Sequence, residues 1–154
     1  MKKVLLVLLT LCFSMGSRAQ EKTMAELFKV MPDSLLPYLT TNNRLDMLDF
    51  MEANMKAEVT NLLDGKSEMT ALAPDSLSIR MNSVLRIDMK VARVAEPVDS
   101  NTQIIRVIRT YTLNENQTER IVDVYSSVWR KLSSVIVQSS LLKRDDELLS
   151  KPHL

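Results

Sequence analysis

Two sets of side chains in one segment, residues 41–56, have the types and spacing that could do chemistry. Three carboxylates recur at intervals of three residues, which places them on one side of a helix: Asp46, Asp49 and Glu52. Three thioethers recur at intervals of four residues: Met47, Met51 and Met55. Carboxylate pairs hydrolyse glycosidic bonds, and thioethers bind Cu(I), so a carboxylate-based hydrolase and a copper site are the chemistries to weigh.

Both sets also fit an ordinary amphipathic helix. At 100° per residue from Leu45, the methionines share one arc with Phe50 and Leu48, whereas the acids share the other arc with Lys56. Methionine fills irregular cores well, and exposed acids serve mainly for solvation. We therefore assign the methionines to the core and the acids to the solvated side.

Most other catalytic chemistry lacks its residue types. His153 is the single histidine, so no Ser-His-Asp arrangement forms within one chain. Cys12 and Gly16 lie in an N-terminal segment with the features of a signal peptide, so the mature chain would have no cysteine and Gly65 as its one glycine. The lack of cysteine excludes thiol catalysis and zinc sites of His and Cys. A single glycine excludes phosphate-binding loops, which need several. We predict no catalytic, cofactor-binding or metal-binding residues, no cofactor, and no enzyme activity.

Two further motifs do not predict a site. Residues 99–110 resemble a calcium loop, but Ile104 stands where glycine is required and Thr110 where a glutamate should chelate. Asn116-Gln117-Thr118 fits an N-glycosylation acceptor, a tripeptide that is common by chance.

The N-terminus has the layout of a secretory signal peptide. Lys2 and Lys3 precede the apolar run of residues 4–13, and Ser17 and Ala19 place small residues before a cleavage point at Gln20. The run is shorter than the roughly 20 residues that span a bilayer. We predict that residues 1–19 are removed and that the product is exported to the periplasm or cell envelope.

Charge argues against some partners and is unevenly spread. Cleavage removes three of the 20 basic residues and none of the 19 acidic residues, so the mature chain carries a net charge of about −2. Nucleic acid and an anionic membrane surface are therefore not expected as partners. Residues 20–64 are acidic, whereas residues 65–132 are mildly basic.

The first part of the mature chain predicts helices. Thr23 and Glu26 form a possible capping box. Pro32 ends that helix, and Asp33 or Ser34 can cap a short turn that contains Pro37. A third helix over residues 44–56 would be capped by Asn42 or Asn43.

From Gly65 onward the apolar period is two, which predicts strands. Residues 77–81 and 85–91 form a hairpin, and a three-residue loop at 82–84 keeps every apolar residue on one side. Residues 104–113 and 120–129 are apolar on both parities, as in strands that are central in a sheet or covered on both faces. Gly65 itself is expected to carry a positive φ.

These elements predict an α+β fold in which two or three N-terminal helices pack on an antiparallel sheet of four or five strands. We assign residues 20–132 to a single domain and residues 133–154 to a C-terminal tail that forms a short helix or is disordered.

Three blocks of sequence resemble a family of small exported proteins from Bacteroidales that is classed as a domain of unknown function. The blocks are residues 31–55 ("MPDSLLPYLTTNNRLDMLDFMEANM"), 64–91 and 119–132. The resemblance implies export in a Gram-negative host and an α+β domain, and it carries over no site residue. It also implies that relatives run further past the strand with Trp129, so that this chain would either expose a sheet edge or be a truncated product.

The function expected from the sequence is that of a non-enzymatic module in the cell envelope. It would bind an envelope protein or a ligand by its sheet face or by the groove between helix and sheet, and it would be peripheral to the membrane at most. A carboxylate-based hydrolase that acts on envelope glycans is the alternative. The oligomeric state stays open.

Overall fold

The computed structural model describes residues 21–114 and 117–138. These residues form a seven-stranded antiparallel sheet with two short α-helices and one turn of 3-10 helix. The predicted fold, two or three helices packed on a sheet of four or five strands, is therefore wrong, because seven strands make up most of the described residues. The predicted signal peptide lies outside the described residues.

The helices come first along the chain. Helix α2 spans Met24–Lys29, the 3-10 turn η2 spans Asp33–Leu35, and helix α3 spans Thr41–Glu52. The predicted capping box of Thr23 and Glu26 is confirmed at α2. Helix α3 starts earlier than predicted, because Thr40 is its cap and Asn43 returns the capping bond to Thr40.

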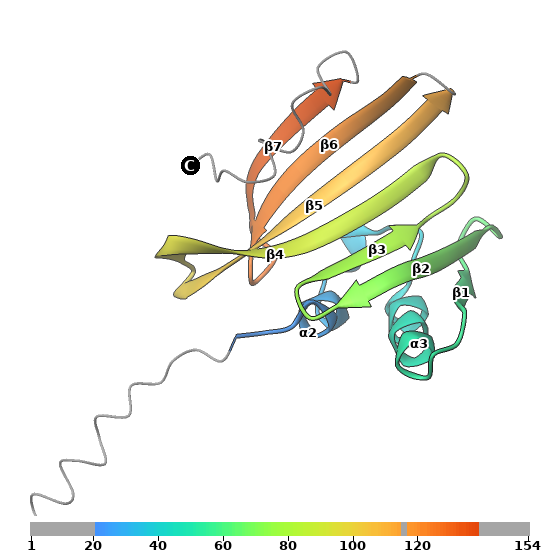
Figure 1. The fold of residues 1–154 in the computed structure, drawn as a ribbon, viewed down its shortest axis with the longest axis horizontal. Coiled ribbons are helices and arrows are strands. Elements are labelled where there is room, and N and C mark those ends of the chain that lie inside the picture. The colour runs from blue at the N-terminus through green and yellow to red at the C-terminus, as the bar shows by residue number, and fades with distance from the viewer. Residues whose placement is uncertain (1–20, 115–116, 139–154) are drawn as a thin grey trace, which may run out of the picture.

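All seven strands follow one another in space as they do in sequence, so the sheet is a simple meander (Figure 1). Every neighbouring pair is antiparallel. The strands are β1 (Ala57–Thr60), β2 (Lys66–Ala73), β3 (Ser76–Arg80), β4 (Leu85–Val98), β5 (Asn101–Asn114), β6 (Gln117–Ser126) and β7 (Lys131–Gln138).

Two details of the predicted strands can be compared directly. The three-residue loop between β3 and β4 is confirmed, because the amide of Met81 donates to the carbonyl of Leu85 over 2.9 Å. The positive φ expected at Gly65 is wrong, since the preceding Asp64 carries it (φ 58°). Gly65 instead makes room for the side chain of Asn61, which would lie 3.3 Å from an added Cβ.

One face of the sheet, here called the inner face, carries the core. Helix α3 lies against β1 and β2, and α2 lies against β2, β3 and β4 (Figure 1). Burying these apolar side chains supplies the main driving force for folding. The buried core includes Met24, Phe28 and Met47 from the helices and Met69, Ile79, Ile87, Ile105 and Val107 from the strands.

The opposite face, here called the open face, carries the alternate residues of the same strands. Pairing across β2 to β6 aligns Glu68, Arg80, Arg86, Thr110 and Arg120 in one row. The side chains of Arg80 and Arg86 are both 60% exposed. The sheet thus has one face that helices cover over β1 to β4 and one face with exposed charge.

Candidate functional site

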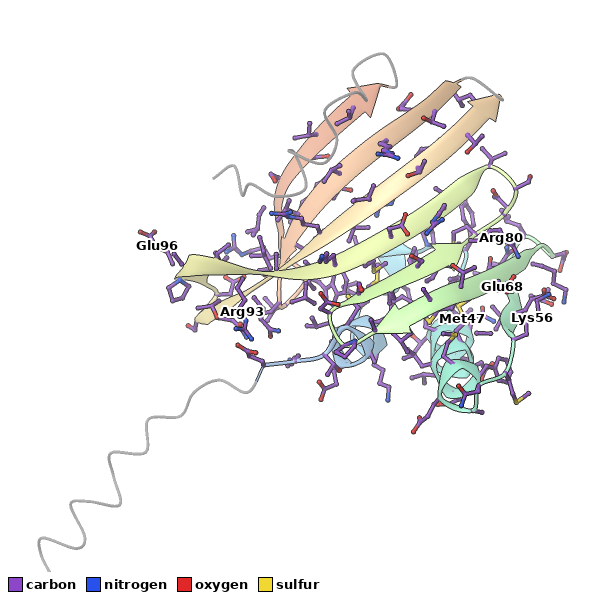
Figure 2. The ribbon with its side chains drawn as sticks, viewed as in Figure 1. Met47, Lys56, Glu68, Arg80, Arg93 and Glu96 are labelled. Carbon is purple, nitrogen blue, oxygen red and sulfur yellow. The ribbon has the colours of Figure 1, made fainter. Side chains whose placement is uncertain are left out.

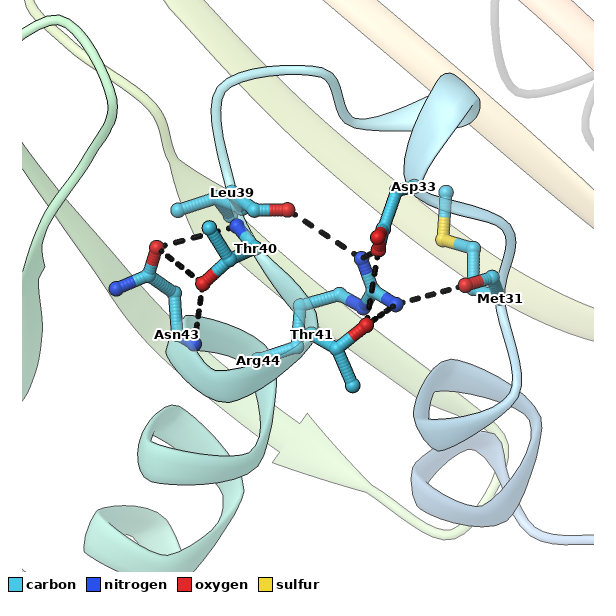
Figure 3. Close-up of polar contacts among 7 residues, drawn as sticks. All are labelled: Met31, Asp33, Leu39, Thr40, Thr41, Asn43 and Arg44. Atoms are coloured by element: carbon cyan, nitrogen blue, oxygen red, sulfur yellow. Dashed lines mark hydrogen bonds and ion pairs between the residues drawn. The ribbon is translucent and has the colours of Figure 1, made fainter.

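A cluster around Arg44 is the first candidate site, and it lies within the family-like block 31–55 (Figure 3). Arg44 is 1% exposed. Its guanidinium donates to the Asp33 carboxylate over 2.6 Å and to the Met31 carbonyl over 2.7 Å, and it lies 5.9 Å from the ring centroid of Phe28. The Arg44 hydrogen bond holds the pKa of Asp33 below its ordinary value.

These contacts are consistent with a role in folding for the Arg44 cluster. The guanidinium ties the turn after α2 to the first turn of α3, so it fixes the path of residues 31–44. A buried cation with this many partners presents little surface to a ligand.

A second cluster lies on the inner face near β7. Asp123, on β6, is 3% exposed and contacts Arg109 on β5 and Lys131 on β7, with Lys131 Nζ 2.8 Å from the carboxylate. Burial alone would raise the pKa of Asp123, but hydrogen bonds from Lys131, Ser134 and Arg109 outweigh it and hold that pKa below its ordinary value. This ion triad fastens three strands together.

The third candidate is the row of arginines on the open face. Arg80 on β3 and Arg86 on β4 stand directly opposite one another. Glu68 forms an ion pair with Arg80, and the two side chains lie close together on neighbouring strands in Figure 2. Asp88 accepts from Arg86 Nε over 3.0 Å. Each arginine thus has one acidic neighbour and still keeps most of its surface in solvent.

A shallow depression of about 260 Å³ lies beside the two arginines, at the β3–β4 loop. Hydroxyl and amide groups of Thr70, Asn82, Ser83 and Thr112 join the guanidinium groups in its lining, with Val84 and Leu85. Its lining contains no carboxylate. The two guanidinium groups supply positive charge, and the hydroxyl and amide groups can donate hydrogen bonds beside them. This combination is the chemistry that recognises carboxylate, phosphate or sulfate.

The charge of the whole open face agrees with that chemistry. Among the residues of β1 to β6 that pair in register on this face, the acidic ones are Glu58, Glu68 and Asp88. Its basic residues on those strands are twice as many: Lys66, Arg80, Arg86, Lys90, Arg106 and Arg120. The acids Asp46, Asp49 and Glu52 are exposed on α3, on the other side of the molecule.

The structure separates the side chains that looked chemical in the sequence. The acids of α3 are exposed as predicted. Met47 is buried, but α3 ends at Glu52 and Met55 is 59% exposed, so the three methionines do not form one buried stripe. Asp99 lies in the β4–β5 turn and pairs with Arg130. His153 and Asn116 lie outside the described residues.

Sequence reasoning missed the arginine row. Each arginine stands at a polar position of an alternating strand, which is the signal that was available. Arg80 faces Arg86 because of the register between β3 and β4. The predicted three-residue loop pairs Met81 with Leu85, and that pairing also places Arg80 opposite Arg86.

Within residues 21–114 and 117–138, no group of three or more His, Cys, Asp or Glu side chains is arranged to hold a metal ion. In the same residues, no helix has the length and apolar character needed to cross a bilayer.

Comparison with known proteins places the chain without assigning an activity. A family model described as "Protein of unknown function (DUF3256)" matches residues 15–149. A solved structure described as "Structure of a domain of an uncharacterized protein from Porphyromonas gingivalis W83" is similar, with a TM-score of 0.58 and 21% identity. The match covers 73% of this chain and 54% of that chain, so this chain spans about half the length of its structural neighbour. At 21% identity the similarity shows a shared fold and nothing about function. The search of curated proteins found no match.

Proposed function

We propose that this chain, which belongs to the DUF3256 family of proteins of unknown function, is a non-enzymatic binding module that takes an anionic partner on its open face. The observation that carries the proposal is the direct pairing of Arg80 with Arg86 beside a donor-lined depression. Like charges directly opposite each other on a sheet destabilise it. Their exposed guanidinium groups present several donors to one anionic group.

The hydrolase alternative gains no support from this site. Glycoside hydrolysis uses two carboxylates on either side of the bond that is cleaved. The depression at the arginines is lined by cations, hydroxyls and an amide. Binding is the function that this lining favours.

We further propose that binding takes place outside the cytoplasm, after cleavage near Ala19. This proposal rests on the basic, apolar and small-residue segments of the N-terminus. The partner would then be an envelope protein or ligand that carries carboxylate, phosphate or sulfate groups.

Retention on immobilised heparin, used as a polyanionic probe, tests the anion site. We expect the wild-type chain to be retained and the double variant Arg80→Gln/Arg86→Gln to elute at lower salt, because two exposed cations are lost. The matched control, Lys22→Gln/Lys29→Gln, removes two exposed cations away from the open face and should elute later than the arginine variant.

Stability is measured alongside retention. The free energy of unfolding of the arginine variant should stay within about 0.5 kcal/mol of wild type, as for other exposed substitutions. Identical elution of the two double variants, or no retention of the wild type, would contradict an anion site at the arginines.

A further inference from the structure

Strands β5 and β6 have apolar residues on both faces. Ile105, Val107 and Tyr125 are buried on the inner face. On the open face, Ile108 pairs with Val122, and Val122 pairs with Val135 of β7. With Val124 and Val137 they form what is here called the apolar stripe. Strands with this composition are usually covered on both sides.

The apolar stripe is half-buried or exposed, with Val135 at 56% exposure. Cations border it. Arg86 and Lys90 stand on β4 beside it, on either side of Asp88, which is in register with Ile108 and forms an ion pair with Arg86. Arg106 and Arg120 stand within β5 and β6, each with interactions of its own, so cations outnumber the single acid on this surface. A partner that fits this surface needs apolar groups on the stripe and a net negative charge on the side that faces β4.

We propose that the apolar stripe binds an amphipathic α-helix of a partner protein, with the apolar side of the helix on the stripe and its acidic side chains toward Arg86 and Lys90. This inference rests on the proposed function and names the class of its partner. Charge complementarity carries the choice of an acidic helix, and helix-on-sheet packing of the same kind covers the inner face.

Other partners fit the surface less well. A small amphiphile needs a concave site that buries most of its surface, and the stripe is part of an open sheet. Single-stranded nucleic acid stacks on aromatic side chains. The aromatic residues of the described strands are Tyr111 and Tyr125, and both stand on the inner face, where Tyr111 pairs with Leu85 and Tyr125 pairs with Ile105.

A synthetic helix tests the inference on the full chain. The probe is a labelled 18-residue amphipathic peptide of leucine, alanine and glutamate, and its reference is a scrambled peptide of the same composition. We expect the amphipathic peptide to bind by fluorescence anisotropy and the scrambled peptide to bind at least about fivefold more weakly.

Single variants of the chain locate the binding surface. Val135→Thr and Lys90→Glu should each weaken binding of the amphipathic peptide by about fivefold or more. The matched controls are Val128→Thr, in the exposed β6–β7 turn, and Lys29→Glu on α2, and each should change binding by less than about twofold.

The outcomes separate the helix from the anion site. Equal binding of the two peptides, with heparin retention still dependent on Arg80 and Arg86, overturns the helix and leaves the proposed function standing. Binding to phosphatidylglycerol vesicles that depends on Val135, without binding of the peptide, overturns the helix in favour of a membrane. The inference is supported if Val135→Thr and Lys90→Glu weaken binding of the amphipathic peptide while Val128→Thr and Lys29→Glu do not.

Discussion

Trp129 adopts a backbone conformation that a bulky residue seldom adopts, with φ at 64° in the turn between β6 and β7. Its indole Nε1 donates to the Leu27 carbonyl at the end of α2 over 3.0 Å, and its ring lies 5.7 Å from that of Tyr125. Trp129 is only 7% exposed, so its side chain makes extensive buried contacts. These contacts offset the conformational energy of the positive φ.

Replacing Trp129 by Phe tests that contact. The variant keeps an aromatic ring and leaves the Leu27 carbonyl without its donor, so we expect the free energy of unfolding to fall by about 2 kcal/mol. Urea denaturation followed by far-UV circular dichroism measures it. Val128→Ala, an exposed neighbour in the same turn, should stay within about 0.5 kcal/mol of wild type.

Asp123 makes stability depend on pH in a defined direction. Its pKa is lowered in the folded state, so the ionised carboxylate stabilises the fold above the unfolded-state pKa of about 3.9 and stops doing so as pH falls through the folded-state pKa. We expect the Tm of the wild type to fall from about pH 5 downward. Asp123→Asn should have a lower Tm at pH 7 and a flatter acid limb.

The control for that acid limb is Asp46→Asn, an exposed residue of α3. Its Tm should follow the wild-type curve throughout. If Asp46→Asn flattens the acid limb as much as Asp123→Asn does, the ion triad is not the source of the acid sensitivity.

At the scale of elements, the turn between β4 and β5 contains strain that can be relieved. Asp99 and Ser100 both have positive φ, at 51° and 62°, which is the geometry of a two-residue type I′ turn. Asp99 is also held by Arg130. Ser100 therefore adopts the conformation at the cost of backbone strain.

Ser100→Gly should stabilise the protein. Glycine adopts positive φ without the steric cost that serine bears, so we expect the free energy of unfolding to rise by about 0.5–1 kcal/mol. Ser83→Gly is the matched control, because Ser83 lies in the β3–β4 loop at negative φ and should give no gain. Equal effects of both changes would show that turn geometry is not the cause.

Elements with regular alternation could be predicted from the sequence, and interrupted ones could not. The capping box at Thr23 and the β3–β4 loop were correct because each depends on residues within a few positions. Strand β2 was missed because a bulge after Met69 shifts the register and breaks the period of two. Strand β7 was assigned to the tail region, and a similar irregularity lies where β6 meets it, between Val124 and Tyr125.

The site was less predictable than the elements. Arg44 looked like an ordinary helix residue, and its burial depends on where the turn after α2 passes. The net charge of the chain is near zero because acids on α3 balance the cations of the sheet, and the mildly basic character of residues 65–132 does not indicate which face of the sheet carries the cations. The alignment of the arginines on one face depends on the register of the strands.

At the scale of the molecule, the sheet ends at β7 in the described residues, where it pairs with β6 alone. Val135 and Ile136 are 56% and 63% exposed on its two faces. Five consecutive residues, 133–137, carry no charge or proline, so this edge offers hydrogen-bonding groups and apolar surface to another chain.

A charge on that edge should limit self-association. We expect Ile136→Lys to raise the protein concentration at which light scattering detects aggregates, with the free energy of unfolding within about 0.5 kcal/mol of wild type. Val128→Lys adds the same charge in the β6–β7 turn and should have little effect. If both variants raise the threshold equally, net charge and not the sheet edge controls aggregation.

The contact between Trp129 and Leu27 joins residues 102 positions apart. The consequence concerns the order in which the chain emerges, whether from a ribosome or across a membrane. Helix α2 emerges first, but the Trp129 side chain that completes its packing emerges only after six strands. The helix therefore lacks this contact during most of synthesis or translocation. A factor that shields apolar surface during this interval would act on the first helix, before any strand after it has paired.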